Sequence, residues 1–291
     1  MLKRLFARRT AERAAEERSR RDALARRDLA RDGDRLVLGH EATGRAALHG
    51  VSPVIHFDDF VFWATHDWFK GDLVTAADHY FDSGHTSARR LASLWNLRHH
   101  ADRLEAPVPG PLRILDFASG YGCVTRHLGS WFPDAARSAS DIHPAACSFV
   151  AGEFGTHSHL SAARPEAFTL ESQFDLVFAL SFFSHLPEDR FGPWLARLAA
   201  LVAPGGLLVF TTHGATSRRL QMPDLPLNRR GYGARVQSEQ LDLSLDDYIQ
   251  AVTLPRFVLA EIGKVPGMEL VGFLEGWWWL NQDCFVLQRC T

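Results

Sequence analysis

The stretch RILDFASGYGCVTRHL, residues 113–128, decides how the chain folds. Its apolar start predicts a short buried strand over residues 112–117, with Asp116 near the carboxyl end. Small residues after such an acid let a ligand approach the backbone closely, and the helix expected over 122–131 would point its positive end at the same place. The acid can brace the turn or bind a cationic amino group. At alternate positions after it stand Ala118, Gly120 and Gly122.

A second acid follows the next predicted strand. Asp141 ends that strand, 19 residues after Gly122. An acid at this edge of an α/β crevice can bind both hydroxyl groups of a ribose, but proteins that bind nicotinamide dinucleotides share the spacing. The loop departs from the dinucleotide fingerprint in two ways: its acid precedes the small residues, and Thr125 stands where the third glycine or alanine belongs.

Strand-like and helix-like segments alternate on both sides of this loop. This alternation predicts an α/β fold with a mostly parallel sheet that helices cover on both faces. Further strands are expected over 157–162, 174–180, 207–212, 268–275 and 283–288, and further helices over 144–154 and 188–203.

The chain divides into three regions by composition. Residues 1–35 carry 12 Lys and Arg against 7 Asp and Glu without a proline, which predicts a charged helical extension or, alternatively, a contact with an anionic surface. Residues 36–111 are expected to form a cap or lid, in which Asp82 or Ser83 caps a helix near residues 88–100. Three prolines over 106–111 end this region. The last region is residues 112–291, with an insertion over 214–266.

Composition excludes several classes of protein. The formal net charge is −2 and the hydrophobic content 46%, so neither whole-chain disorder nor a nucleic-acid partner is expected. No apolar stretch reaches the roughly 18 residues that a membrane span needs, and no secretory signal is evident. Four cysteines without framework spacing predict reduced thiols and a cytoplasmic location.

The sequence resembles the class I S-adenosylmethionine-dependent methyltransferases in four motifs. RILDFASGYG is similar to the family's glycine loop, with Ala118 in place of the first glycine, and SASDI supplies the ribose-binding acid. FDLVFALSFFSHLPED, residues 174–189, is similar to the fourth strand and the segment after it. LAALVAPGGLLVFTTHG, residues 198–214, is similar to the helix, turn and fifth strand. The resemblance implies a Rossmann-like fold with a seven-stranded, mostly parallel sheet and an antiparallel last strand.

The resemblance also implies S-adenosyl-L-methionine as cofactor and a role for each matching residue. The methionine part would be surrounded by residues of the loop, the ribose held by Asp141, and the adenine packed on Ile142. Ser181 and Phe182 would line the other side of the cofactor. Tyr80, in a segment expected to fold over the cofactor, is a further predicted contact. The loop residues are Asp116, Ala118, Ser119, Gly120 and Gly122.

Several residues are candidates for chemistry beside the cofactor. A hydroxyl acceptor needs a general base, and His185 and His213 follow the fourth and fifth strands at the edge where ligands bind. His79 and His85 are weaker candidates. The His157-x-His159 pair lacks further ligands nearby, so no metal site is predicted. For Cys123, packing is favoured over an activated thiol.

The prediction for function is methyl transfer to an oxygen or nitrogen atom of a small molecule, such as a sugar or secondary metabolite. Trp277, Trp278 and Trp279 pack in the core or form an aromatic wall for the acceptor. The N-terminal helix offers a surface for a homo-oligomer. Two alternatives stay open: a non-catalytic cofactor-binding or scaffold protein on the same fold, and a nicotinamide-dependent oxidoreductase.

Overall fold

A seven-stranded sheet forms the centre of the computed structural model, which describes residues 30–238, 240 and 242–291. In spatial order the strands are β11 (Met268–Trp278), β12 (Gln282–Arg289), β8 (Val202–His213), β7 (Phe174–Ala179), β4 (Arg113–Phe117), β5 (Ala136–Asp141) and β6 (His157–Leu160). The four pairings among β8, β7, β4, β5 and β6 are parallel, whereas β12 runs antiparallel to both of its neighbours. The mostly parallel sheet with an antiparallel last strand, predicted above, is therefore confirmed.

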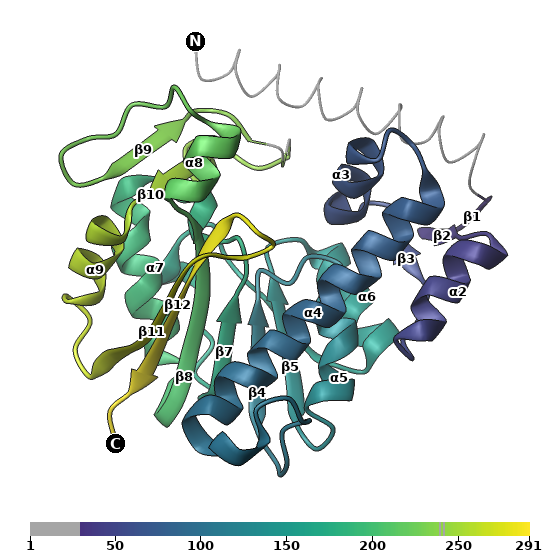
Figure 1. The fold of residues 1–291 in the computed structure, drawn as a ribbon, viewed down its shortest axis with the longest axis horizontal. Coiled ribbons are helices and arrows are strands. Elements are labelled where there is room, and N and C mark those ends of the chain that lie inside the picture. Colours follow the sequence, from purple (N-terminus) through teal and green to yellow (C-terminus); the bar gives the residue numbers. More distant parts are fainter. Residues whose placement is uncertain (1–29, 239, 241) are drawn as a thin grey trace.

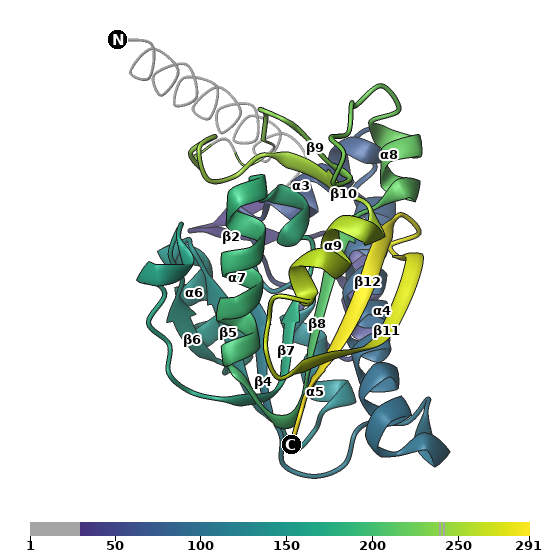
Figure 2. The ribbon, with the colours of Figure 1, turned by 90° about the vertical axis from the view of Figure 1, so that its left-hand side faces the viewer.

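Helices cover both faces of this sheet (Figures 1 and 2). α7 (Glu188–Ala200) and α9 (Pro255–Ile262) pack on one face, while α4 (Leu73–His99) runs across the other, beside the short α5 (Leu128–Trp131). Successive strand residues face opposite cores, as Leu115 and Ile114 do in β4. Burial on both faces explains why these strands read as continuous apolar runs.

The helix boundaries differ from the sequence expectation at two places. α4 begins at Leu73, ahead of the expected start, because the Asp72 carboxylate accepts a hydrogen bond from the Thr75 backbone N–H at 3.1 Å. Asp82 and Ser83 are therefore interior residues, and the predicted cap is wrong. The helix expected over 122–131 is broken into a 3₁₀ turn, Thr125–His127, and α5. By contrast, α6 (Pro144–Phe154) matches its prediction and ends at Gly155 in the left-handed conformation.

The segment before α4 forms a small unit with its own core. It contains β1 (Ala30–Asp32), β2 (Arg35–Val37), α2 (His40–Leu48), β3 (Ile55–His56) and α3 (Phe60–Trp68). The predicted helical extension lies outside the described residues up to residue 29, and its remaining residues form an antiparallel hairpin instead of a helix. Arg126 joins this unit to the sheet, since its buried guanidinium donates to the carbonyl groups of Ser52 and Val54 at 3.0 Å.

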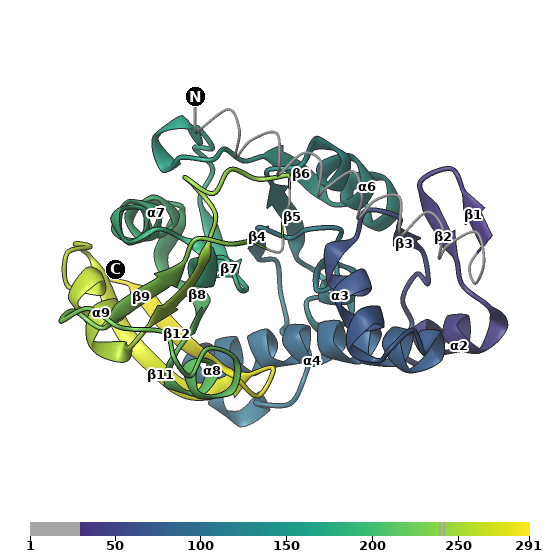
Figure 3. The ribbon, with the colours of Figure 1, turned by 90° about the horizontal axis from the view of Figure 1, so that it is seen from above.

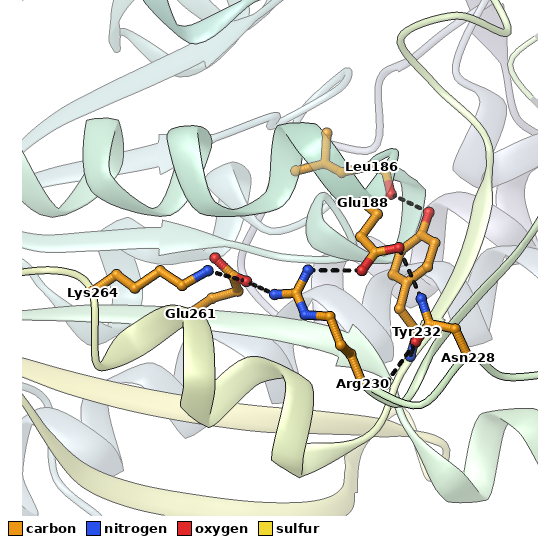
Figure 4. A network of polar contacts seen from close by, with 7 residues as sticks. All are labelled: Leu186, Glu188, Asn228, Arg230, Tyr232, Glu261 and Lys264. Carbon is orange, nitrogen blue, oxygen red and sulfur yellow. Dashed lines mark hydrogen bonds and ion pairs between the residues drawn. The ribbon is translucent and has the colours of Figure 1, made fainter.

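The predicted insertion contains α8 (Ala215–Gln221), β9 (Tyr232–Arg235), β10 (Gln250–Thr253) and α9. Part of it belongs to the main core, because Ala251 and Phe257 are fully buried against α7 and the sheet. A polar network holds it to α7 (Figure 4): Arg230 pairs with both Glu188 and the buried Glu261, and Lys264 pairs with Glu261 at 2.7 Å. The prediction of an insertion outside the core thus applies only to the residues between these elements.

Within the described part of the chain, the helices are too short or too polar to cross a membrane.

Candidate active site

A cavity of about 1430 Å³ opens at the carboxyl ends of β4, β5 and β7. Its other walls come from α3, α4, the insertion and the turn between β11 and β12; Figure 3 looks down on this edge. The volume exceeds the roughly 300–1,000 Å³ of a typical small-ligand pocket, so there is room for two ligands. Ten predicted site residues line it: Tyr80, Asp116, Ala118, Ser119, Gly120, Asp141, Ile142, Ser181, Phe182 and His185.

The loop after β4 has the left-handed backbone that its glycines predict. Gly120 has φ +53°, and a Cβ atom placed there would meet nothing within 4 Å, so its bare face borders open space. Gly122 has φ +81°, but a Cβ atom there would lie 2.5 Å from the Phe154 ring. Gly122 does not line the cavity; it allows the loop to pack on α6. Ala118 holds φ +57° without being glycine, which is strained backbone of the kind found at functional sites.

Asp116 is a buried acid at the foot of this loop. The Thr125 hydroxyl donates to its Oδ2 at 2.7 Å, so the residue that departs from the dinucleotide fingerprint braces the acid. Burial is the main cause that raises the pKa of Asp116 to about 7. The hydrogen bond from Thr125 lowers this pKa and the repulsion from Asp141 raises it further, but both effects are smaller. A cationic group bound beside Asp116 would favour its ionised form.

Asp141 joins the two strand ends directly. Its Oδ2 accepts a hydrogen bond from the Gly120 backbone N–H at 2.8 Å, and its Oδ1 accepts from both the backbone N–H and the imidazole of His143. The other imidazole nitrogen of His143 lies 2.9 Å from Asp242, in the insertion. Hydrogen bonds to Asp141 and then Asp242 raise the pKa of His143 to about 10. The protonated imidazole therefore ties the insertion to Asp141, the acid predicted to bind ribose.

Ser181 follows the end of β7 with a left-handed backbone conformation, as Ala118 does at the end of β4. Its φ is +58°, its backbone N–H donates to the Thr211 hydroxyl at 2.8 Å, and its hydroxyl accepts from the Gln282 amide at 3.0 Å. Thr211 in turn donates to Gln282 at 2.6 Å. These bonds hold the strained backbone in place. Phe182, the next residue, packs edge-on against Phe117.

Tyr80 lines the cavity, but its hydroxyl group is engaged within the protein. It donates to the buried Asp59 at 2.6 Å and accepts from Arg126 at 3.0 Å. Burial raises the pKa values of both Asp59 and Tyr80. Because α3 carries the Asp59 cap and Arg126 follows the glycine loop, this network fixes the N-terminal unit over the site. Tyr80 thus positions the wall of the cavity.

The two candidate bases occupy different environments. His185 lines the cavity, stacks on Tyr248 at 4.4 Å between ring centroids, and places Nδ1 3.1 Å from the Ile249 carbonyl oxygen. A carbonyl oxygen only accepts, so Nδ1 carries a proton in this contact. His213 does not line the cavity; it lies behind His185, and burial lowers its pKa to about 3. The structure therefore favours His185 over His213.

The other side chains considered for metal binding, reactivity or acceptor contact lie in different parts of the structure. No group of side chains in the described ranges is suited to hold a metal ion, His157 and His159 included. Cys123 is buried, and burial raises the pKa of its thiol, which fits the packing interpretation. Trp278 is fully buried, whereas Trp279 lines the cavity, so core and wall interpretations each hold for one residue. His79 lines the cavity, but His85 packs against His49 and His127 outside it.

Some lining residues had no signal in the sequence. Asp242 and Tyr248 come from a polar stretch without a motif, and Arg90 lies on α4 next to a second arginine. His143 directly follows the SASDI motif and could have been found as the residue two after the ribose acid.

Comparisons with known proteins agree with this architecture. Residues 115–208 match the family model described as a methyltransferase domain. The fold is similar to that of DesVI from Streptomyces venezuelae, with 16% identity, a TM-score of 0.51, and 79% of this chain and 98% of that chain covered. No curated protein matches the chain in sequence.

Two further solved structures are similar at lower scores. One is S-adenosylmethionine-bound CalS10, an amino pentose methyltransferase from Micromonospora echinaspora, with 20% identity, a TM-score of 0.48, and 71% of this chain and 91% of that chain covered. The other is the N-methyltransferase NodS from Bradyrhizobium japonicum with S-adenosyl-L-homocysteine, with 15% identity, a TM-score of 0.47, and 80% and 99% covered.

The family match identifies residues 115–208 as a methyltransferase domain, and the sheet order agrees with the class I S-adenosylmethionine-dependent methyltransferases that the sequence resembles. The site residues fit this cofactor. The open face of Gly120 leaves space beside the loop, and two acids line the same cavity, as a ligand with cationic groups requires. Asp141 Oδ2 can accept one more hydrogen bond, but Oδ1 already accepts two from His143. Bidentate binding of the ribose therefore requires the His143 imidazole to release Asp141.

Proposed function

We propose that the enzyme transfers a methyl group to an oxygen or nitrogen atom of a small molecule, such as a sugar or secondary metabolite. One observation carries this proposal: a single cavity extends from Asp141 at the end of β5 to Trp279 beyond β11. The cofactor-binding residues occupy only the part of it nearest β4 and β5. The remainder has walls from α3, α4, α8 and the turn after β11, which suits an acceptor of limited size.

The protein's share of the reaction is mainly alignment and exclusion of water. S-adenosylmethionine supplies a methyl group on a positively charged sulfur, so the leaving group needs no further activation. Asp116 and Asp141 hold the two ends of the binding loop, and the Ser181 network holds the end of β7 next to it. These fixed positions lower the entropic cost of bringing acceptor and donor into line.

His185 is the general base in this proposal. Its Nδ1 donates to the Ile249 carbonyl oxygen, which orients the ring at the cavity wall, where the imidazole would take the proton of an acceptor hydroxyl or ammonium group. The stacking ring of Tyr248 keeps the imidazole in one orientation. Because both contacts come from the insertion, the insertion orients the base as well as closing the cavity.

The alternatives have less support. A nicotinamide-dependent oxidoreductase would need a small residue at Thr125, but the Thr125 hydroxyl is bonded to Asp116. A non-catalytic scaffold would not need the strained backbone at Ala118 and Ser181. All four cysteines are free thiols, which supports a reducing cytoplasm as the location.

Turnover with a panel of acceptors tests the proposal. The protein is incubated with S-adenosylmethionine and amino sugars, phenolic metabolites, transfer RNA and a protein mixture, and S-adenosylhomocysteine formation is measured for each. We expect turnover with a small molecule and none above background with the macromolecules. Turnover with RNA or protein alone would contradict the small-molecule acceptor, and turnover with none of them would favour the scaffold.

A further inference from the structure

Arg90 on α4 is a charged residue without a counter-ion among the residues that the structure describes. Its side chain is half-buried and lines the cavity, yet within the part of the chain that the structure describes it forms no hydrogen bond or ion pair. Burial lowers its pKa from the ordinary value, although an arginine stays protonated under physiological conditions. Its guanidinium therefore offers N–H donors at the cavity wall that have no acceptor in the described ranges.

Aromatic rings fix the position of this guanidinium group. Its central carbon lies 4.5 Å from the Trp277 ring centroid and 5.8 Å from that of Trp278. Trp278 is itself locked, since its indole N–H donates to the Ser87 hydroxyl, one turn earlier on α4, at 3.1 Å. A preorganised guanidinium loses little entropy when it binds an oxyanion.

The neighbouring Arg89 lies in different surroundings from Arg90. It does not line the cavity, and its guanidinium lies 3.8 Å from the Glu105 carboxylate. The two adjacent arginines thus have different surroundings. Arg89 forms an ion pair at the surface, whereas Arg90 lines the cavity without an ion pair to any described residue. Arg89 is accordingly a matched control for Arg90.

The wall around Arg90 is apolar and partly strained. Trp279 and Leu280, in the turn after β11, have φ values of +47° and +62°, which costs free energy for residues that are not glycine. Leu280 is 81% exposed, Leu220 on α8 63% and Trp68 on α3 77%, and all three line the cavity. Exposed apolar side chains from three separate elements that line one cavity indicate a binding surface.

This part of the cavity lies beyond the cofactor-binding residues. Trp278 pairs with Gln282 on β12, and four strand spacings separate β12 from β5, which carries Asp141. At about 4.8 Å a spacing, that separation is about 19 Å. The other predicted cofactor-binding residues follow β4 and β7, which lie three and two spacings from β12, so β7 is about 10 Å away. The region at Arg90 therefore lies on the β12 side of all of them.

We propose that Arg90, Trp279 and Leu280 form an acceptor subsite for an amphiphilic small molecule that carries a carboxylate or phosphate group. The guanidinium pairs with the oxyanion, and the apolar body of the acceptor packs on the turn and on Leu220. This inference rests on the proposed function, which it narrows to acceptors with a negative charge and an apolar part. Planar, bidentate recognition of either oxyanion is a property of arginine that lysine lacks.

Four probes of one shape test the charge preference: 4-phenylbutyrate, 3-phenylpropyl phosphate, neutral 4-phenylbutanol and cationic 4-phenylbutylamine. Their dissociation constants are measured by ligand-observed nuclear magnetic resonance, with and without saturating S-adenosylhomocysteine. We expect at least one anion to bind the unaltered protein about tenfold more tightly than the alcohol, equivalent to about 1.4 kcal/mol. Arg90→Met should abolish this preference and Arg89→Met should keep it, while the stronger anion distinguishes carboxylate from phosphate.

Titration of each variant with S-adenosylhomocysteine and 5′-methylthioadenosine separates the subsite from the cofactor site. We expect the Arg90→Met variant to bind both ligands with the same affinity as the unaltered protein. A tenfold loss for S-adenosylhomocysteine alone would assign Arg90 to the amino-acid part of the cofactor and overturn the proposal. Equal binding of anions and alcohol by the unaltered protein would overturn it too. Failure of the unaltered protein to bind S-adenosylhomocysteine would instead refute the proposed function, whatever the probes do.

Discussion

The Asp141 carboxylate accepts a hydrogen bond from the backbone N–H of Gly120 at 2.8 Å. This bond joins the end of β5 to the loop after β4, so Asp141 and the glycine loop form one unit. It also gives the carboxylate a fixed orientation before any ligand binds. An acid held by the backbone in this way is preorganised for binding, which lowers the entropic cost of taking up the cofactor.

Replacing this acid should weaken cofactor binding more than folding. Asp141→Ala removes charged hydrogen bonds, and we expect S-adenosylhomocysteine affinity to fall by about 1–3 kcal/mol in calorimetric titration. Asp102→Asn, at an exposed carboxyl on the 3₁₀ turn after α4, is the control and should leave the affinity unchanged. Equal affinities for the Asp141 variant and the unaltered protein would remove Asp141 from the site.

The two glycines of the loop should separate stability from binding. Gly122→Ala places a Cβ atom 2.5 Å from Phe154 at φ +81°, so we expect a loss of about 2–4 kcal/mol in denaturant unfolding. Gly120→Ala meets no atom within 4 Å and should cost only the backbone strain, about 1–2 kcal/mol. Its methyl group projects beside the loop, however, and should weaken S-adenosylhomocysteine binding. The opposite ranking in unfolding would contradict these assignments.

His143 should give the stability of the protein a specific pH dependence. Its folded-state pKa, about 10, is above the ordinary 6.5, so the folded state binds this proton more tightly than the unfolded chain. The resulting stabilisation is complete below about pH 6.5 and is lost as the pH rises towards 10. We therefore expect the difference in unfolding free energy between the unaltered protein and His143→Gln to shrink between pH 7 and pH 10. A constant difference over that range would show that the Asp141–His143–Asp242 bridge is absent.

The two histidines predicted from sequence should differ in their kinetic effect. His185→Asn should reduce kcat by about 10²- to 10⁴-fold while S-adenosylhomocysteine affinity stays the same, as expected for loss of a general base. His213→Asn removes a buried neutral ring outside the cavity and should change kcat less than tenfold in a folded protein. Similar losses in the two variants would mean that His185 acts through packing.

Local patterns predicted the sheet and the loop because short apolar strands followed by small residues leave few alternatives. The strand over residues 174–179 and the helix over 144–154 follow from their apolar spacing and terminal residues. The length of α4 did not, because its first half mixes polar residues with a few apolar ones, such as Tyr80 and Phe81, that the unit before it buries. Local propensity has no access to such tertiary packing.

The site was predicted where a motif is contiguous and missed where the fold joins distant segments. Asp116, Gly120 and Asp141 belong to local motifs, and all three line the cavity. The contact between His143 and Asp242 spans 99 residues, and that between Ser87 and Trp278 spans 191. Since no periodicity relates such pairs, the bridge to the insertion and the fixed position of Arg90 became visible only in three dimensions.

Calorimetric titration with S-adenosylhomocysteine, and in parallel with NADH, tests the central claim most directly. The unaltered protein should bind S-adenosylhomocysteine with a micromolar dissociation constant and NADH not at all, because the loop that lines the cavity at Asp116, Gly120 and Asp141 lacks the dinucleotide fingerprint. Binding of NADH in place of S-adenosylhomocysteine would contradict the assignment of this protein as a methyltransferase.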